Sequence, residues 1–103
     1  MSRAAKVDFH PDATAEFDAA TDWYRENSEQ AAENFVSEVD GAIARIAQSL
    51  SMWADYLRGT RRYLLRRFPY AVVYILHEGR IKVVAVAHGR RRPGYWKKRL
   101  NAY

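Results

Sequence analysis

The chain has 103 residues and no cysteine, so we expect a single domain over residues 1–103, without disulfides or thiolate metal sites. Its three histidines lack metal-ligand spacing and no apolar stretch approaches the ~20 residues of a membrane span, so we expect a cytoplasmic protein without cofactor, metal or membrane association. The net charge of +5 hides an asymmetry: residues 1–58 contain five basic and eleven acidic residues, whereas residues 59–103 contain twelve basic residues and one acidic residue.

A short strand and a helix are predicted at the start of the chain. Residues 5–9 alternate weakly between polar and apolar side chains. His10-Pro11 then indicates a break and a helix start, because proline is tolerated in the first turn of a helix, where the backbone N–H has no partner. Apolar residues recur at helical spacing up to about residue 26: Ala13, Phe17, Ala20 and Tyr24. The pattern therefore predicts a strand over 5–9 and a helix over 11–26.

A second helix is predicted directly after the first. Asn27, with Gln30 three residues later, resembles a capping box that starts a new helix. A continuous apolar stripe follows: Ala32, Phe35, Val36, Val39, Ile43, Ile46, Ala47 and Leu50. Because the connection is so short, the two helices should form an antiparallel hairpin. Helical periodicity is lost in residues 51–59, where we expect three apolar side chains to hold the connection against the core: Trp53, Tyr56 and Leu57.

Three strands are predicted after this connection. Residues 60–68, 70–77 and 80–88 are rich in β-branched and aromatic side chains, and Pro69 and Glu78-Gly79 separate them. The middle run is apolar on both faces, which predicts a central strand. In the last run, strict alternation assigns one face to Ile81, Val83 and Ala85, and the opposite face to Lys82, Val84, Val86 and His88.

Together these elements predict an α+β fold. An N-terminal strand leads into an antiparallel two-helix hairpin, which packs on a mostly antiparallel four-stranded sheet. The other face of the sheet needs partial cover. A short C-terminal helix or tail from residues 93–103 would supply it, or an associating partner would.

The segment HGRRRPGYW, residues 88–96, is the richest in candidate functional side chains. His88 could act as a general base, because the ordinary pKa of histidine lies near neutral pH, or it could be a strand-end histidine bonded to the backbone. Arg90 or Arg91 could clamp a phosphate with a fork of donors, and Arg92 could bind a target. The three arginines cannot all face one way, so we expect at least one of them to be a solvated loop charge. Trp96 could stack on a nucleic-acid base or pack the tail back onto the sheet.

Basic residues outside this segment could extend the same surface and bind nucleic acid or another target. They are Arg61, Arg62, Arg66, Arg67 and Lys82. The surplus of +11 in residues 59–103 favours an electropositive surface that attracts phosphate or an acidic partner. Two alternatives are open: the arginines protect an edge strand from mispairing, or acidic helices neutralise basic strands within the fold.

Two phrases carry a resemblance to a known family. F-P-Y-x-V-x-Y begins at Phe68, and H-G-R-R-x-P-x-Y-W begins at His88. With the order strand, helix hairpin, three strands and basic tail, nearly the whole chain resembles the RelE/ParE superfamily of toxins from bacterial type II toxin–antitoxin systems, in the branch described as plasmid stabilisation proteins. The resemblance implies a RelE-like fold, growth inhibition, and a small acidic antitoxin that complements the basic half of the chain.

The resemblance implies two different mechanisms. RelE-like members cleave messenger RNA, usually on the ribosome and without a metal, and need a base, an acid and cationic donors. In that case Arg90 or Arg91 would clamp the phosphate, Tyr95 or Trp96 would be the aromatic acid or stacking residue, and His88 is a candidate base. The lysines or glutamate that these members have on the first meander strand are matched only loosely, by Arg66 and Arg67. ParE-like members act on DNA gyrase. Ala71 departs from the RNA-cleaving pattern, which usually has an arginine at that position, so enzyme status is left open. A non-catalytic basic nucleic-acid-binding module is the alternative from another class.

Overall fold

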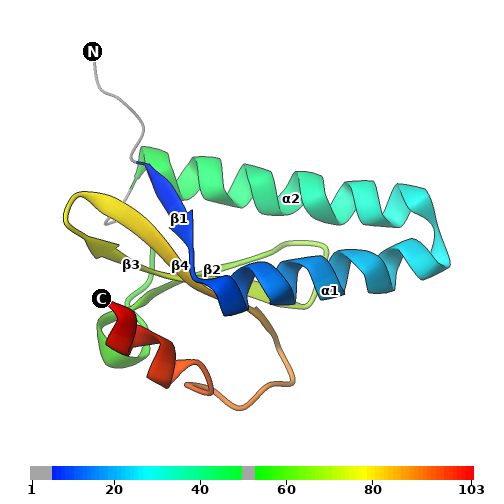
Figure 1. The fold of residues 1–103 in the computed structure, drawn as a ribbon. Coiled ribbons are helices and arrows are strands. Elements are labelled where there is room, and N and C mark those ends of the chain that lie inside the picture. The colour runs from blue at the N-terminus through cyan, green and yellow to red at the C-terminus, as the bar shows by residue number, and fades with distance from the viewer. Residues whose placement is uncertain (1–5, 50–52) are drawn as a thin grey trace.

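The computed structural model describes residues 6–49 and 53–103 (Figure 1). Its elements, in chain order, are β1 (Val7–Phe9), α1 (Pro11–Asn27), α2 (Glu29–Gln48), a 3-10 turn (Leu57–Gly59), β2 (Arg61–Leu64), β3 (Tyr70–His77), β4 (Arg80–His88) and a C-terminal 3-10 turn (Lys97–Ala102). The four strands form one sheet in the order β1-β4-β3-β2, in which β1 is parallel to β4 and the other two pairs are antiparallel. The predicted α+β fold with a mostly antiparallel four-stranded sheet is confirmed. Neither helix in the described residues is long and apolar enough to cross a membrane.

The helix hairpin forms where the sequence predicts it, but with a different cap. Helix α1 begins at Pro11, and the His10 side chain caps it by accepting a hydrogen bond from the Asp12 backbone N–H at 3.0 Å. Ser28 separates the helices: its backbone is extended and its hydroxyl accepts from the Ala31 N–H at 2.9 Å. The expected restart at Asn27 is therefore wrong by one residue, because the serine hydroxyl satisfies the free N–H of the new helix.

The two faces of the sheet have separate cores. The helices cover one face, where buried side chains from both layers meet: Phe35, Val39, Ile46, Val72, Tyr74, Ile81 and Val83. On the opposite face Trp96 packs against Val73, Val84 and Ala85. Figure 1 shows the C-terminal segment, in red, on the side of the sheet away from the helices. The tail thus supplies the cover that the sequence required, and β3 is central with both faces buried.

The alternation predicted for β4 fails at a β-bulge. Val73 pairs with Ala85 and Tyr74 pairs with Val83, so Val84 is an extra residue without an opposite partner. Val84 and Ala85 both belong to the core on the tail side, and Val86 returns to the helix side. The predicted faces are therefore correct up to Val84 and wrong from Ala85 on. One consequence is that His88 lies edge-on to Tyr70, with ring centroids 5.0 Å apart.

The first predicted strand of the meander is shorter than expected. It ends at Leu64, because the Glu38 carboxylate on α2 accepts the backbone N–H groups of Arg66 and Arg67 at 2.5 and 3.1 Å. These groups are therefore not available to a strand ladder. In the preceding connection, Trp53 packs on Tyr63 with ring centroids 4.8 Å apart, as expected, whereas Leu57 is exposed. Two of the expected positions, Leu50 and residue 5, lie outside the described residues. Residue 6 is described but precedes β1, which begins at Val7.

The buried tryptophan of the tail gives the first testable prediction. Trp96 is 1% exposed, so Trp96→Ala should lower the free energy of unfolding by about 3–5 kcal/mol, through lost burial and the cavity it leaves. Trp23, which is 58% exposed, provides the matched control, and Trp23→Ala should change the free energy of unfolding by less than about 0.5 kcal/mol. Urea denaturation measures both variants, and equal losses would contradict the role given to the tail.

Candidate functional site

A hollow of about 290 Å³ lies between β2, β3 and the loop after β4. Its apolar lining comes from Leu64, Leu65, Phe68, Pro69, Ala71, Val73 and Ala87. Arg62, Arg91 and Arg92 also line it, and we call the hollow with these three residues the arginine pocket. An apolar floor with a few charged groups is the usual composition of a ligand or partner site.

Aromatic rings hold two of these arginines. The Arg62 guanidinium carbon lies 4.2 Å from the centroid of the Tyr56 ring, and that of Arg91 lies 3.8 Å from the centroid of Tyr95. Within the described residues, Arg62, Arg91 and Arg92 form no ion pair with a carboxylate. A ring orients a guanidinium without cancelling its charge, so the pocket stays cationic.

A second hollow continues the cationic surface beyond Arg91 and Arg92. It lies between the turn at Leu57–Gly59 and the start of the tail, and it adds Arg58 and Lys97 to the lining. Arg58 has a φ of 56°, in the left-handed region that costs a non-glycine residue on the order of 1 kcal/mol. The sequence indicates no role for Arg58 or Lys97, because there they differ in no way from solvated surface charges.

His88 lines the arginine pocket but is poorly suited to remove a proton. Its Nδ1 accepts a hydrogen bond from the Arg90 backbone N–H at 3.0 Å. The neutral ring must then have its proton on Nε2, which is a donor and has no free lone pair. This geometry matches the alternative reading of a strand-end histidine bonded to the backbone. The Arg90 side chain itself is not among the residues that line the pocket.

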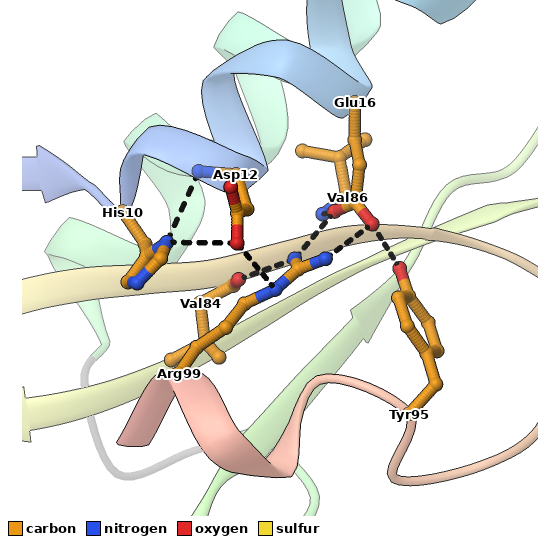
Figure 2. Close-up of polar contacts among 7 residues, drawn as sticks. All are labelled: His10, Asp12, Glu16, Val84, Val86, Tyr95 and Arg99. Carbon is orange, nitrogen blue, oxygen red and sulfur yellow. Dashed lines mark hydrogen bonds and ion pairs between the residues drawn. The ribbon is translucent and has the colours of Figure 1, made fainter. Parts of the chain in front are cut away.

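Tyr95 lines the pocket with its ring, while its hydroxyl points to helix α1 (Figure 2). The hydroxyl donates to Glu16 Oε2 at 2.5 Å. Burial raises the pKa of Tyr95, and the neighbouring Glu16 carboxylate raises it further, well above the ordinary value. The phenol therefore keeps its proton at neutral pH and shares it with a carboxylate inside the protein.

Glu16 is a functional candidate that the sequence did not reveal. Figure 2 shows its carboxylate between three elements of the fold. Besides Tyr95, it accepts from the Val86 backbone N–H at 3.1 Å and from both terminal nitrogens of Arg99 at 2.9 and 3.0 Å. Arg99 also donates to the Val84 carbonyl at 3.0 Å. On a helix surface a single glutamate resembles any solvated acid, so no sequence signal identified it.

Several of the predicted binding residues lie in ion pairs with the acidic half of the chain. Arg61 pairs with Asp55 at 3.0 Å, Arg67 with Glu38 at 3.0 Å, and Lys82 with Asp8 at 2.7 Å. The alternative in which acidic residues neutralise basic strands applies to these three. The side chain of Arg66 does not line the arginine pocket, although its backbone bonds to Glu38. Trp96 is buried, so neither face of its ring is open to a base.

The comparisons with known proteins agree with this architecture. Residues 7–93 match the family described as ParE toxin of type II toxin-antitoxin system, parDE. A chain of the chromosomal ParDE TA system from P. aeruginosa is similar with a TM-score of 0.72 and 19% identity, over 84% of this chain and 98% of that chain. A mutant of the E. coli toxin RelE in the free state is similar with a TM-score of 0.57 and 18% identity, over 96% of this chain and 93% of that chain. No curated protein matches the sequence. The two structural likenesses confirm the RelE-like fold.

The state of Tyr95 gives a prediction on pH dependence. Because its pKa is raised in the folded protein, the stabilisation it contributes is present below about pH 10, the ordinary pKa, and is lost as the pH rises towards the folded value. One titrating group contributes a slope of at most about 1.4 kcal/mol per pH unit, and partial exposure of the ring reduces it. Denaturant unfolding above pH 10 should therefore show a shallower loss of stability for Tyr95→Phe than for the wild type. Identical slopes would mean that Tyr95 ionises freely.

Proposed function

Because the chain belongs to the ParE toxin family of type II toxin–antitoxin systems, we propose that it inhibits growth by acting on DNA gyrase and not by cleaving messenger RNA. Membership of the family makes the chain the toxin of such a system, with an antitoxin as its partner. The choice of target rests on the contents of the arginine pocket. Because the toxin would meet both gyrase and the antitoxin in the cytoplasm, we propose that this chain is cytoplasmic.

The observation that carries the proposal is that the pocket offers cationic groups without a free acid–base pair. Cleavage through a ribose hydroxyl needs one group to take a proton and another to give one. The lone pair of His88 Nδ1 is used by Arg90, and the hydroxyl of Tyr95 is used by Glu16. Ala71 lies in the pocket, 7% exposed, where RNA-cleaving relatives usually have an arginine. These contacts favour a site that binds an anionic group over one that performs proton transfer.

The apolar part of the surface favours a protein target. Leu64 is 61% exposed and lines the arginine pocket, and Leu57 is 42% exposed and lines the adjoining hollow. Apolar side chains beside arginines are typical of protein–protein interfaces, whose centres combine apolar burial with arginine anchors. Nucleic-acid backbones would use the arginines but gain little from exposed leucines. This contrast supports a gyrase-directed toxin over a basic nucleic-acid-binding module.

The same surface supports neutralisation by an acidic antitoxin. Acidic side chains of the antitoxin would offset the charge of Arg62, Arg91 and Arg92, which no carboxylate of the described residues pairs. Its apolar side chains would cover Leu64 and Leu57. Neutralisation and target binding would then compete for one surface.

Induction in bacterial cells tests the choice of target. Expression of the toxin without its antitoxin should produce DNA-damage signalling and gyrase trapped on DNA, while transcripts stay intact during the first minutes. Coexpression with the acidic protein encoded beside it should restore growth. Early loss of intact transcripts would instead indicate RNA cleavage. Growth that is unaffected in every arm, together with steeply salt-dependent binding to nucleic acid, would favour the nucleic-acid-binding module.

Substitutions in the arginine pocket test the location of the site. Arg91→Ala and Arg62→Ala should each lower toxic potency about tenfold or more, because truncating an arginine that is an interface hot spot costs about 2 kcal/mol or more, and about 1.4 kcal/mol corresponds to tenfold in affinity. Lys98→Ala removes the same charge from an exposed residue that lines neither hollow, and it should leave potency unchanged. Growth inhibition at matched expression measures all three. Full potency of both arginine variants would place the site elsewhere.

A further inference from the structure

We propose that Glu16 positions the Arg91 guanidinium in the arginine pocket by holding the ring of Tyr95. The inference deepens the proposed function, on which it rests, by giving Tyr95 and Glu16 roles as positioning residues. It assigns Tyr95, which the sequence suggested as a catalytic acid, a task that uses its ring and its fixed hydroxyl. Figure 2 shows the contacts from Glu16 on helix α1 to Tyr95 in the tail, and the Arg91 guanidinium lies over the Tyr95 ring.

The first step is that the Glu16 carboxylate has one well-defined place. Oε1 accepts from the Val86 N–H and from Arg99 Nη1, and Oε2 accepts from the Tyr95 hydroxyl and from Arg99 Nη2. The side chains of Glu16 and Arg99 are 16% and 15% exposed, so water competes little for these contacts. A carboxylate held by donors from two other elements cannot change rotamer without losing several hydrogen bonds.

The second step is that this carboxylate is anchored to the sheet itself. Strand β1 pairs with β4 only as far as Phe9 opposite Val83. Beyond that point, the Val84 carbonyl bonds to Arg99 and the Val86 N–H bonds to Glu16. The two side chains thus satisfy backbone groups that a longer β1 would have paired. Glu16 therefore fixes the Tyr95 hydroxyl relative to strand β4.

The third step is that Tyr95 fixes Arg91. The ring is held at its hydroxyl end by Glu16, and the Arg91 guanidinium carbon lies 3.8 Å from the ring centroid. Arg91 and Tyr95 line both the arginine pocket and the adjoining hollow, and they also line a third hollow beside Glu16 and Trp23. The pair therefore forms the wall that these hollows share. Its position decides where the positive charge of Arg91 meets a ligand.

The energetic consequence is preorganisation. A free arginine side chain loses much rotational freedom when it binds, and this loss weakens binding. A guanidinium already aligned over a ring loses less. The hydrogen bond that the Tyr95 hydroxyl donates to the carboxylate also increases the negative charge on the ring, which strengthens the attraction of the ring for a cation. We therefore expect the Glu16–Tyr95 hydrogen bond to improve ligand binding by Arg91, although neither Glu16 nor Tyr95 needs to contact the ligand.

The competing explanation is that Glu16 only fastens the tail through Arg99. Tyr95→Phe separates the two roles, because it keeps the ring and the Glu16–Arg99 pair and removes only the hydroxyl. Glu16→Gln removes the negative charge and one of the two acceptor oxygens, and so weakens the contacts to both Tyr95 and Arg99. Asp8→Asn is the matched control, because it also converts a paired carboxylate to an amide. Asp8 contacts Arg80 and Lys82 at 2.7 Å near the start of β4, and it does not line the arginine pocket.

Nuclear magnetic resonance of the arginine Nε–Hε groups tests the positioning without any ligand. In the wild type the Arg91 Hε resonance should be displaced upfield by the Tyr95 ring current, and Arg91→Lys assigns it by its disappearance. Tyr95→Phe and Glu16→Gln should lose at least about half of that displacement, whereas Asp8→Asn should retain it. An unchanged Arg91 resonance in Tyr95→Phe overturns the proposal. If Glu16→Gln fails to fold, Tyr95→Phe still decides.

Toxic potency tests the consequence for function. Tyr95→Phe should reduce potency severalfold in the wild-type background and should have no further effect in an Arg91→Ala background, since its influence passes through Arg91. Equal reductions in both backgrounds would show that Tyr95 acts independently of Arg91 and would overturn the inference. Full potency of Arg91→Ala alone would instead overturn the proposed function of the pocket, and the resonance of Arg91 would still decide whether Glu16 positions it.

Discussion

The Glu16 carboxylate is the contact on which the arrangement of the site depends. It joins helix α1 to the edge of β4 and to the tail, through hydrogen bonds to Val86, Tyr95 and Arg99. The tail in turn places Trp96 on the face of the sheet that the helices leave uncovered. This partly buried carboxylate therefore helps to close the second core, withdraws the Tyr95 hydroxyl from proton transfer, and aligns the ring beneath Arg91.

The distribution of charge has a second consequence for function. The acidic half of the chain neutralises part of the basic half, as in the pairs of Asp8 with Lys82 and of Glu38 with Arg67. Arg62 and Arg91 contact aromatic rings and keep their charge. The cationic surface is consequently smaller than the sequence suggests and is concentrated around the arginine pocket and the hollow that adjoins it. A small cationic rim on an apolar floor favours a partner with acidic and apolar groups over an extended polyanion.

Most of the fold could be predicted from the sequence, because it follows from local patterns. His10-Pro11 predicts the start of α1, and apolar side chains on both faces of residues 70–77 predict a central strand. The bulge at Val84 could not be predicted, since Val84 and Ala85 are both apolar and fit either face. The resemblance through residues 68–74 and 88–96 led to the correct family.

The site was less accessible to sequence reasoning, because it depends on tertiary pairing. Arg61 and Arg62 are adjacent in the chain, yet one is paired with a carboxylate and the other lies over a ring. Tyr95 and Glu16 are 79 residues apart, so no local pattern connects them. The sequence could name the right segment, residues 88–96, but could not distinguish a side chain that binds a ligand from one that holds the fold.

The most direct measurement is a reconstituted assay with the purified toxin, DNA gyrase, supercoiled plasmid and ATP, run beside programmed ribosomes with their messenger RNA. A binding site without an acid–base pair predicts linear plasmid covalently attached to gyrase, less of it with Arg91→Ala, and uncut messenger RNA. Cleaved messenger RNA with intact plasmid would contradict the account.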